Sequence, residues 1–495
     1  MATAQGGTSA FGAIRDSIGT GFEAFTDAGE AVDRLDDLFQ ESLDALRSSF
    51  EAGDPGTAAH RSEATYPYLA MELLTDAEDL PEGTRFPYGV QLEPGFYGTT
   101  VTRPALFRSY LREQIAALLS LYGRPVLVGR SRRPIPLPYV IENSVTDITE
   151  AELRRLSRRF ALPDLTVTDD RIANCELQPN PSLPRPLALF TAERTDYSLA
   201  RLRHYTGTDP AHFQRFVLLT NYQRYVDAFR QWGREQVDAR ADYELFAEPG
   251  GILHRPGDGE ATPPANLPQM PAYHLTRADG NGITLINIGV GPSNAKTITD
   301  HVAVLRPHCW LMLGHCAGLR RTQRLGDYVL AHGYLRDDHV LDDDLPPDMP
   351  VPPIAEVQVA LQEATSRITG LQGDELKTRM RTGTVMTTDN RNWELRFNAL
   401  FARINMSRSI AVDMESATIA ANGFRFRVPY GTLLCVSDKP LHGELKLGGM
   451  AQSFYRERVS QHLLVGLETM RALREAGVHR LHSRKLRGFD EPPFR

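Results

Sequence analysis

Cysteine is scarce in this chain of 495 residues, with four copies, at positions 175, 309, 316 and 435. Their spacing shows no CxxC motif and no paired framework, which argues against a fold held by disulfides. No His/Cys/Glu spacing suggests a structural zinc site, and no Walker loop is present. We therefore expect reduced, mostly buried thiols, no metal site and a cytoplasmic location.

Long apolar runs and an excess of basic charge are also missing. No apolar run approaches the roughly 20 residues that a membrane helix needs. Residues 1–18 lack the charged-then-apolar order of a signal peptide. The formal net charge is −7, which argues against a general nucleic-acid binder. The expected partners are therefore neither membranes nor nucleic acids.

The composition is ordinary for a globular protein, with 41% hydrophobic and 24% charged residues. A chain of this length exceeds one ordinary core, so two domains are expected. Residues 1–20 are interpreted as a flexible extension, and residues 21–180 as a smaller α+β domain. The elements expected in that domain are helices near 29–50 and 107–122, and strands at 66–71, 85–89, 97–103 and from 124.

Residues 181–495 are expected to form an α/β domain with a mixed, largely parallel sheet flanked by helices. The proline-rich stretch 177–186 suits a linker, and 190–240 is interpreted as a helical connector. A strand at 284–288, a helix at 295–305 and a strand at 309–313 predict a parallel βαβ unit. A strand at 428–436 and a helix at 452–475 continue the pattern, with glycine and polar turns at the strand ends, where open α/β sheets build their sites.

Several short motifs follow one another in this second region, beginning with Ile288-Gly-Val-Gly-Pro-Ser-Asn-Ala-Lys and Leu313-Gly-His-Cys-Ala-Gly. Thr387-Thr-Asp-Asn-Arg-Asn-Trp-Glu, Asp413-Met-Glu-Ser-Ala and Val436-Ser-Asp-Lys-Pro-Leu-His-Gly come next. In this order they resemble the AMP nucleosidase family of the nucleoside phosphorylase superfamily. Each motif is weak alone, but their order and number make the match strong. With Leu202-Arg-His-Tyr-Thr-Gly-Thr and the closing Glu491-Pro-Pro-Phe-Arg, the resemblance covers nearly the whole chain except the extreme N-terminus.

The resemblance implies hydrolysis of AMP to adenine and ribose 5-phosphate, with no cofactor for the chemistry. It also implies a homohexamer of two-domain subunits, activation by MgATP and inhibition by inorganic phosphate. By the same resemblance the N-terminal domain is regulatory, although it shows no catalytic constellation.

Two acids suit the cleavage of a purine N-glycosidic bond. Asp438, at the end of a strand, is the candidate proton donor to N7 of the base, and an acid in that role needs a raised pKa. Glu415 is the candidate ligand of the ribose 2′- and 3′-hydroxyls, with Met414 against the sugar. The alternatives are a turn aspartate, a glutamate that stabilises a helix N-terminus, and a core methionine.

The phosphate site is predicted at Gly291, Ser293 and Asn294, where a glycine turn opens a helix, together with His315 on the next strand. Tight strand–helix packing is the alternative for the glycines. His315 stands where relatives commonly have a small hydroxyl residue, which we interpret as an adaptation to a substrate that carries its own 5′-phosphate. The candidate base-binding residues are Arg391, Asn392 and Trp393, and a buried core tryptophan is the alternative for the last.

Two other functions stay open from the sequence. One is a purine nucleoside phosphorylase, in which inorganic phosphate replaces water as the nucleophile. The other is a catalytically inactive nucleotide-binding protein on the same scaffold, against which the presence of both acids argues.

Overall fold

The computed structural model describes residues 11–51, 64–73, 93–141, 150–178, 180–240, 242–259, 264, 266–444, 452–481, 483–488 and 491–494. The chain forms two compact units, one made of 1–200 with 487–495 and the other of 201–486. The first unit thus runs twenty residues beyond the expected boundary and includes the end of the chain. The expected strand at 85–89 lies outside the described residues.

The first unit contains a five-stranded sheet in the order β1-β4-β2-β3-β5. Its strands are β1 (Gly19–Phe25), β2 (Thr65–Leu73), β3 (Gly95–Thr100), β4 (Val126–Pro134) and β5 (Arg185–Pro186). Its helices are α1 (Gly12–Ile18), α2 (Ala28–Glu51), α3 (Arg108–Tyr122), α4 (Pro138–Ile141) and α5 (Glu150–Arg159). Residues 12–20, interpreted from the sequence as a flexible extension, instead form α1 and enter β1, which pairs with β4.

The amphipathic spacing of α2 and α3 is what packs this unit. Leu35 of α2 and Ile115 of α3 are fully buried in one cluster with Leu69, Val126 and Val128 of the sheet. Helices on a small, mostly antiparallel sheet are the expected α+β arrangement.

The second unit contains a ten-stranded mixed sheet in the order β14-β13-β12-β15-β11-β6-β10-β9-β7-β8, and β14 also pairs with β11. Its strands are β6 (Phe216–Thr220), β7 (Leu245–Glu248), β8 (Ile252–His254), β9 (Ala272–Thr276), β10 (Ile283–Asn287), β11 (Cys309–Gly318), β12 (Tyr328–Asp337), β13 (Met380–Thr388), β14 (Ala411–Asp413) and β15 (Tyr430–Asp438). Strands β15, β11, β6 and β10 are mutually parallel neighbours, as the βαβ pattern predicts.

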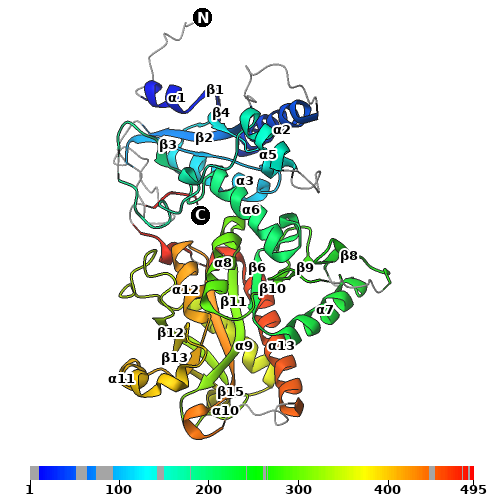
Figure 1. The fold of residues 1–495 in the computed structure, drawn as a ribbon, viewed down its shortest axis with the longest axis vertical. Helices are drawn as coiled ribbons and strands as arrows, with labels where there is room; N and C mark the ends of the chain where they lie inside the picture. The colour runs from blue at the N-terminus through cyan, green and yellow to red at the C-terminus, as the bar shows by residue number, and fades with distance from the viewer. Residues whose placement is uncertain are drawn as a thin grey trace, which may run out of the picture. The chain divides into compact units, whose positions relative to one another are not determined.

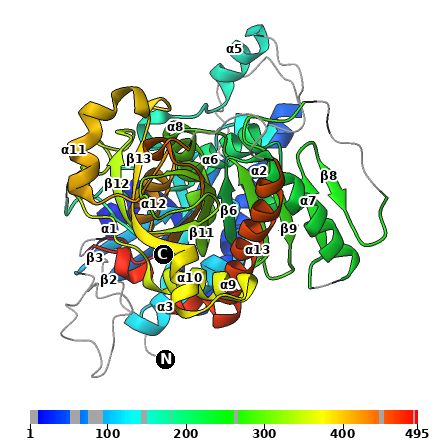
Figure 2. The same ribbon diagram turned by 90° about the horizontal axis from the view of Figure 1, so that it is seen from below.

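Helices cover both faces of this sheet. They are α7 (Gln223–Asp238), α8 (Pro292–Val302), α9 (Ala355–Thr369), α10 (Gly373–Arg379), α11 (Phe397–Ser407), α12 (Ser416–Arg425) and α13 (Gln452–Ala476). Helices α9 and α13 lie side by side (Figures 1 and 2). Tyr430 of β15 packs on Gly423 of α12, whereas the next residue, Gly431, lies against Val357 of α9. Because successive residues of a strand point to opposite faces, α12 and α9 cover opposite sides.

One sequence interpretation was wrong in this unit. The expected helical connector at 190–240 contains helix α6 (Ala192–Thr206) and helix α7, but β6 lies between them. The residues of β6 are all buried, because the strand pairs with β10 on one edge and β11 on the other. A short apolar run of this kind is compatible with either a buried strand or a helix, and its sheet partners decide.

Candidate active site

Polar residues follow neighbouring parallel strands at one edge of the second unit's sheet. Asn221 follows β6, the turn 289–294 follows β10, and Asp438 ends β15. His315 lies in the last part of β11. Parallel strands present their carboxyl ends at the same edge, so these residues are brought together from distant parts of the chain.

The two candidate acids, Glu415 and Asp438, lie near each other because β11 pairs with both β14 and β15. Ala317 of β11 pairs with Val412 of β14 and also with Asp438 of β15. A strand residue has one neighbour on each edge, so the backbones of Val412 and Asp438 lie roughly 10 Å apart, two strand spacings. Glu415 comes three residues after Val412. The two acids therefore lie on either side of β11, in one neighbourhood.

Glu415 is held by two donors from two different strand ends. The amide of Gly291 donates to Oε1 at 2.7 Å, and Nδ2 of Asn221 donates to Oε2 at 3.1 Å. The residue is only 1% exposed. Burial, and secondly the negative charge of Asp413, raise the pKa of Glu415 to about 8. The two hydrogen bonds thus fix the carboxyl group in place. Because its pKa is raised, ionising this group costs free energy, and a cationic ribosyl group would offset that cost.

Asp413 fixes the backbone around Glu415. Its carboxylate accepts from Thr387 Oγ1 at 2.6 Å and from the amide of Ser416 at 2.9 Å, and the Ser416 hydroxyl also donates to it. Thr387 Oγ1 in turn accepts from the amide of Ala417 at 2.9 Å. These bonds satisfy the first amides of α12, so the helix begins directly after Glu415. The neighbouring Met414 is half-buried.

A β-bulge directs Asp438. Cys316 pairs with Val436 and Ala317 with Asp438, so Ser437 is an extra residue on β15. A bulge changes the direction of the residues beside it, and bulges are common next to active sites. The Ser437 hydroxyl donates to Asp438 Oδ1 at 2.6 Å, which fixes the orientation of the carboxyl group.

The predicted phosphate residues divide into two groups. Gly291 has a φ of +117° at the start of α8, and its amide is already bonded to Glu415. Ser293 is exposed, and Asn294 Nδ2 donates to the carbonyl of Val290 at 3.3 Å. The structure thus places the glycine turn against the candidate ribose ligand. Its role toward a phosphate stays a prediction.

His315 is oriented by a chain of hydrogen bonds that begins in α13. Nε2–H of His462 donates to the carbonyl of Leu433 at 2.9 Å. Burial lowers the pKa of His462 to about 4, so its Nδ1 is an acceptor for the Tyr225 hydroxyl at 2.6 Å. The Tyr225 hydroxyl oxygen then accepts a hydrogen bond from His315 Nε2–H at 3.2 Å. The Tyr222 ring packs edge-on against the His315 ring, with 4.0 Å between the ring centroids. The tautomer of His315 follows from these partners.

The predicted base-binding residues differ in exposure. Arg391 and Asn392 are exposed in the segment after β13. Trp393 is 5% exposed and belongs to a core cluster with Leu319, which follows β11, and Met386 of β13. Trp393 therefore has a packing role in this structure. Its contact with a purine stays a prediction.

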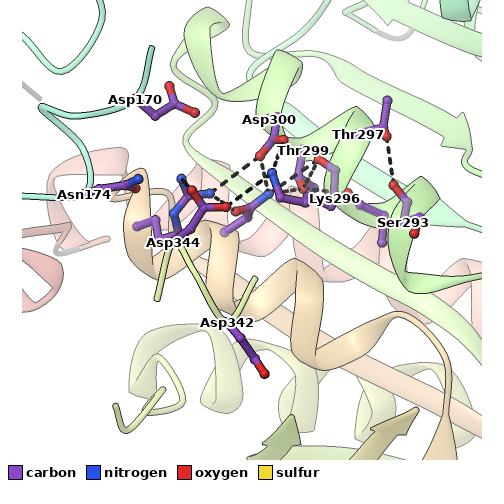
Figure 3. Close-up of polar contacts among 12 residues, drawn as sticks. Asp170, Asn174, Ser293, Lys296, Thr297, Thr299, Asp300, Asp342 and Asp344 are labelled. Carbon is purple, nitrogen blue, oxygen red and sulfur yellow. Dashed lines mark hydrogen bonds and ion pairs between the residues drawn. The ribbon is translucent and has the colours of Figure 1, made fainter. Parts of the chain in front are cut away.

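An ion network ties α8 to α12 behind these residues. In Figure 3, Lys296 and Asp300 of α8 lie together with Asp344, and Lys296 Nζ is 2.8 Å from Asp300 and 3.4 Å from Asp344. From α12, Asn422 Nδ2 donates to Asp300 Oδ1 at 2.8 Å, and Arg425 pairs with both aspartates. The network thus joins the later parts of α8 and α12, the two helices that begin after Gly291 and Glu415.

Sequence reasoning missed Asn221, Tyr225 and His462. For Asn221 a signal existed, because a polar residue directly follows the apolar run 216–220, but that run was interpreted as helix. Tyr225 and His462 carry no local signal. Their role depends on the packing of α7 and α13 against β11.

We find no group of three or more His, Cys, Asp or Glu side chains in the described ranges that could hold a metal ion. Among the same residues, no helix is long and apolar enough to cross a membrane.

Comparison with known proteins identifies the family of this chain. Residues 255–462 match the family model described as "Phosphorylase superfamily", and residues 30–184 match "Bacterial AMP nucleoside phosphorylase N-terminus". The fold and these matches thus define a member of the phosphorylase superfamily.

The chain is 51% identical over 477 residues to the AMP nucleosidase of Escherichia coli (strain K12), with 94% of this chain and 98% of that protein covered. The AMP nucleosidase of Escherichia coli O157:H7 matches to the same extent. The crystal structure of AMP nucleosidase from Bacteroides thetaiotaomicron VPI-5482 is 28% identical, with a TM-score of 0.43, over 57% of this chain and 99% of that one. The chain belongs to the AMP nucleosidase family, as its motifs predicted.

Proposed function

We propose that this protein hydrolyses the N-glycosidic bond of AMP, releasing adenine and ribose 5-phosphate. The observation that carries the proposal is the placement of Glu415 and Asp438 on either side of β11. Family membership supports AMP as the substrate, since the curated relatives are AMP nucleosidases over nearly their full length.

The reaction breaks the C1′–N9 bond, with positive charge developing on the ribosyl ring and negative charge on the base. Adenine is a poor leaving anion, so a proton delivered to N7 lowers the barrier. Asp438 donates that proton, and well-placed proton transfer contributes roughly 10²–10⁴-fold. Water then adds to C1′ and loses a proton, which completes ribose 5-phosphate.

Glu415 acts on the other half of the substrate. Its carboxylate accepts hydrogen bonds from the 2′- and 3′-hydroxyls, and its negative charge stabilises the cationic sugar. In the structure those oxygens accept from Gly291 and Asn221. A carboxylate has about four acceptor positions, so the sugar hydroxyls add to these bonds or displace one of them. Met414 packs on the sugar.

The remaining substrate contacts are assigned by the motifs. His315 binds the 5′-phosphate together with the helix N-terminus at Gly291, Ser293 and Asn294. If His315→Ala changed neither the affinity for AMP nor the turnover, this assignment would fail. Arg391, Asn392 and Trp393 lie around the base.

Regulation and assembly belong to the same proposal and rest on the family alone. The enzyme is a cytoplasmic homohexamer, MgATP activates it and inorganic phosphate inhibits it. To test both effectors, initial rates at low AMP concentration are compared in three mixtures: without effector, with MgATP, and with inorganic phosphate. Equal rates in all three mixtures would contradict the regulatory part.

The deciding experiment supplies AMP with and without inorganic phosphate and identifies the sugar product. Release of ribose 5-phosphate without added phosphate is expected. A strict phosphate requirement with a 1-phosphorylated sugar would instead show a phosphorylase. The absence of adenine in both mixtures would indicate a nucleotide-binding protein without activity.

A further inference from the structure

A short turn closes on itself directly after Asp438. The amide of Lys439 donates to the carbonyl of Glu444 at 2.7 Å, and the amide of Glu444 donates back to the carbonyl of Lys439 at 3.2 Å. Gly443, with a φ of +75°, permits the reversal. The side chains close the same turn, because Lys439 Nζ donates to Glu444 Oε1 at 2.6 Å.

The two members of this pair differ in exposure. The Lys439 side chain is 4% exposed and the Glu444 side chain 45%. A buried ammonium group is unfavourable unless it is paired. In the described part of the chain, Glu444 is the carboxylate with which Lys439 forms an ion pair.

The position of Lys439 creates a conflict with the chemistry. A general acid must keep its proton near neutral pH, but a nearby cation favours the ionised carboxylate. Consecutive Cα atoms are about 3.8 Å apart, so the lengths of the two side chains limit the distance between the charged ends of Asp438 and Lys439 to at most roughly 14 Å. At that range an uncompensated charge in a largely buried site lowers a carboxyl pKa by roughly one unit.

Other ionisable and polar groups surround this turn from several elements. Burial, and then the nearby groups Cys435, Asp413 and Asp438, raise the pKa of the Cys316 thiol on β11. Gln323 and Lys439 both lie close to Gly318, and His442 contacts the carbonyl of Leu319. Asp327, whose carbonyl accepts from the amide of Val436, is paired with Arg379. None of these groups replaces Glu444 at Lys439 among the described residues.

We propose that Glu444 is a positioning residue of the active site: by pairing with the buried Lys439 it neutralises the cation beside Asp438 and lets that acid keep its proton. The inference rests on the proposed role of Asp438 and adds the residue that maintains it. Glu444 acts through Lys439 and need not touch the substrate.

The test is the pH dependence of kcat for AMP hydrolysis between pH 5 and 9, in the full-length protein. In wild type, kcat should fall at high pH, where Asp438 loses its proton; this fall is the basic limb of the profile. Glu444→Gln should move the basic limb to lower pH by roughly one unit. The rate at pH 8 then falls about tenfold relative to wild type, whereas the rate near pH 5.5 changes little. The double variant Lys439→Met with Glu444→Gln should return the limb to its wild-type position, because no cation remains to be neutralised.

Glu356→Gln is the matched control, since Glu356 of α9 accepts from Lys485 Nζ at 2.7 Å in another ion pair. It should leave the limb in place. A purely structural role for Glu444 would lower the rate equally at all pH values, and the double variant would not recover. Either of those results, or an unmoved limb in Glu444→Gln, overturns the inference.

Failure of the proposed function gives a different pattern. In that case wild type releases no adenine, or Asp438→Asn keeps full turnover. If wild type is active, Asp438→Asn is not, and the limb of Glu444→Gln stays unmoved, the inference alone is wrong.

Discussion

The buried carboxyl group of Glu415 should make the stability of the second unit depend on pH. The perturbation is Glu415→Gln, which has the same shape and keeps an acceptor for the Gly291 amide. The Asn221 amide can rotate to accept from the new side-chain amide. The substitution therefore removes the charge with little change in packing.

The sign follows from the two pKa values. The carboxyl pKa rises from 4.5 to about 8 because of burial and then Asp413. The folded state therefore binds the proton more tightly than the unfolded state between these values. Its stability falls as pH rises through this window. The full shift corresponds to roughly 5 kcal/mol as an upper bound, and the part between pH 5.5 and pH 8 to about 3 kcal/mol.

The assay is denaturant unfolding at pH 5.5 and pH 8, followed by tryptophan fluorescence. All three tryptophans, Trp232, Trp310 and Trp393, belong to the second unit, so the signal reports that unit. From pH 5.5 to pH 8, the unfolding free energy of wild type should fall by about 3 kcal/mol more than that of Glu415→Gln. An exposed control, Glu363→Gln on α9, should behave as wild type. Parallel pH dependences for wild type and Glu415→Gln would refute the reasoning.

Three further substitutions test the supports of the site. Gly291→Ala should raise KM for AMP and lower the unfolding free energy by about 1–3 kcal/mol, because a φ of +117° is strained for alanine. An unchanged KM in steady-state kinetics would contradict this prediction. Asn422→Leu should lower the unfolding free energy by about 1–3 kcal/mol, because it removes the hydrogen bonds that Asn422 donates to Thr299 and Asp300 of α8; denaturant curves that match wild type would show that the α8–α12 network is dispensable. Tyr225→Phe should raise KM for AMP more than it lowers kcat, since it frees the ring of His315; the reverse split would exclude a role in substrate binding.

The fold was predictable where the sequence pattern is local. The apolar spacing of α2 and α3, the βαβ unit around α8 and the long helix α13 all follow from periodicity and turn residues. The strand β6 was not predictable, because a run of four apolar residues does not distinguish a buried strand from a helix, and pairing with β10 and β11 decides the outcome. The N-terminal strand β1 was missed for a similar reason, since β4, its partner, lies about a hundred residues away.

The candidate site shows the same division. The two acids were identified from short motifs, but their supports come from far along the chain. Asn221 and Glu415 are separated by 194 positions, and Tyr225 and His462 by 237. No local pattern specifies such contacts, because they depend on which strand ends the sheet order brings together. The sequence does not determine the direction of the Lys439 side chain, because that direction depends on Glu444 and on the bulge at Ser437.

The central claim is that Asp438 supplies a proton to the leaving base, and one comparison tests it most directly. Asp438→Asn is assayed with AMP and with a ribosyl 5-phosphate whose leaving group is p-nitrophenolate, which departs without protonation. The account predicts a loss of roughly 10²–10⁴-fold with AMP and little loss with the nitrophenyl substrate. Equal losses with both substrates, or full turnover of AMP, would contradict it.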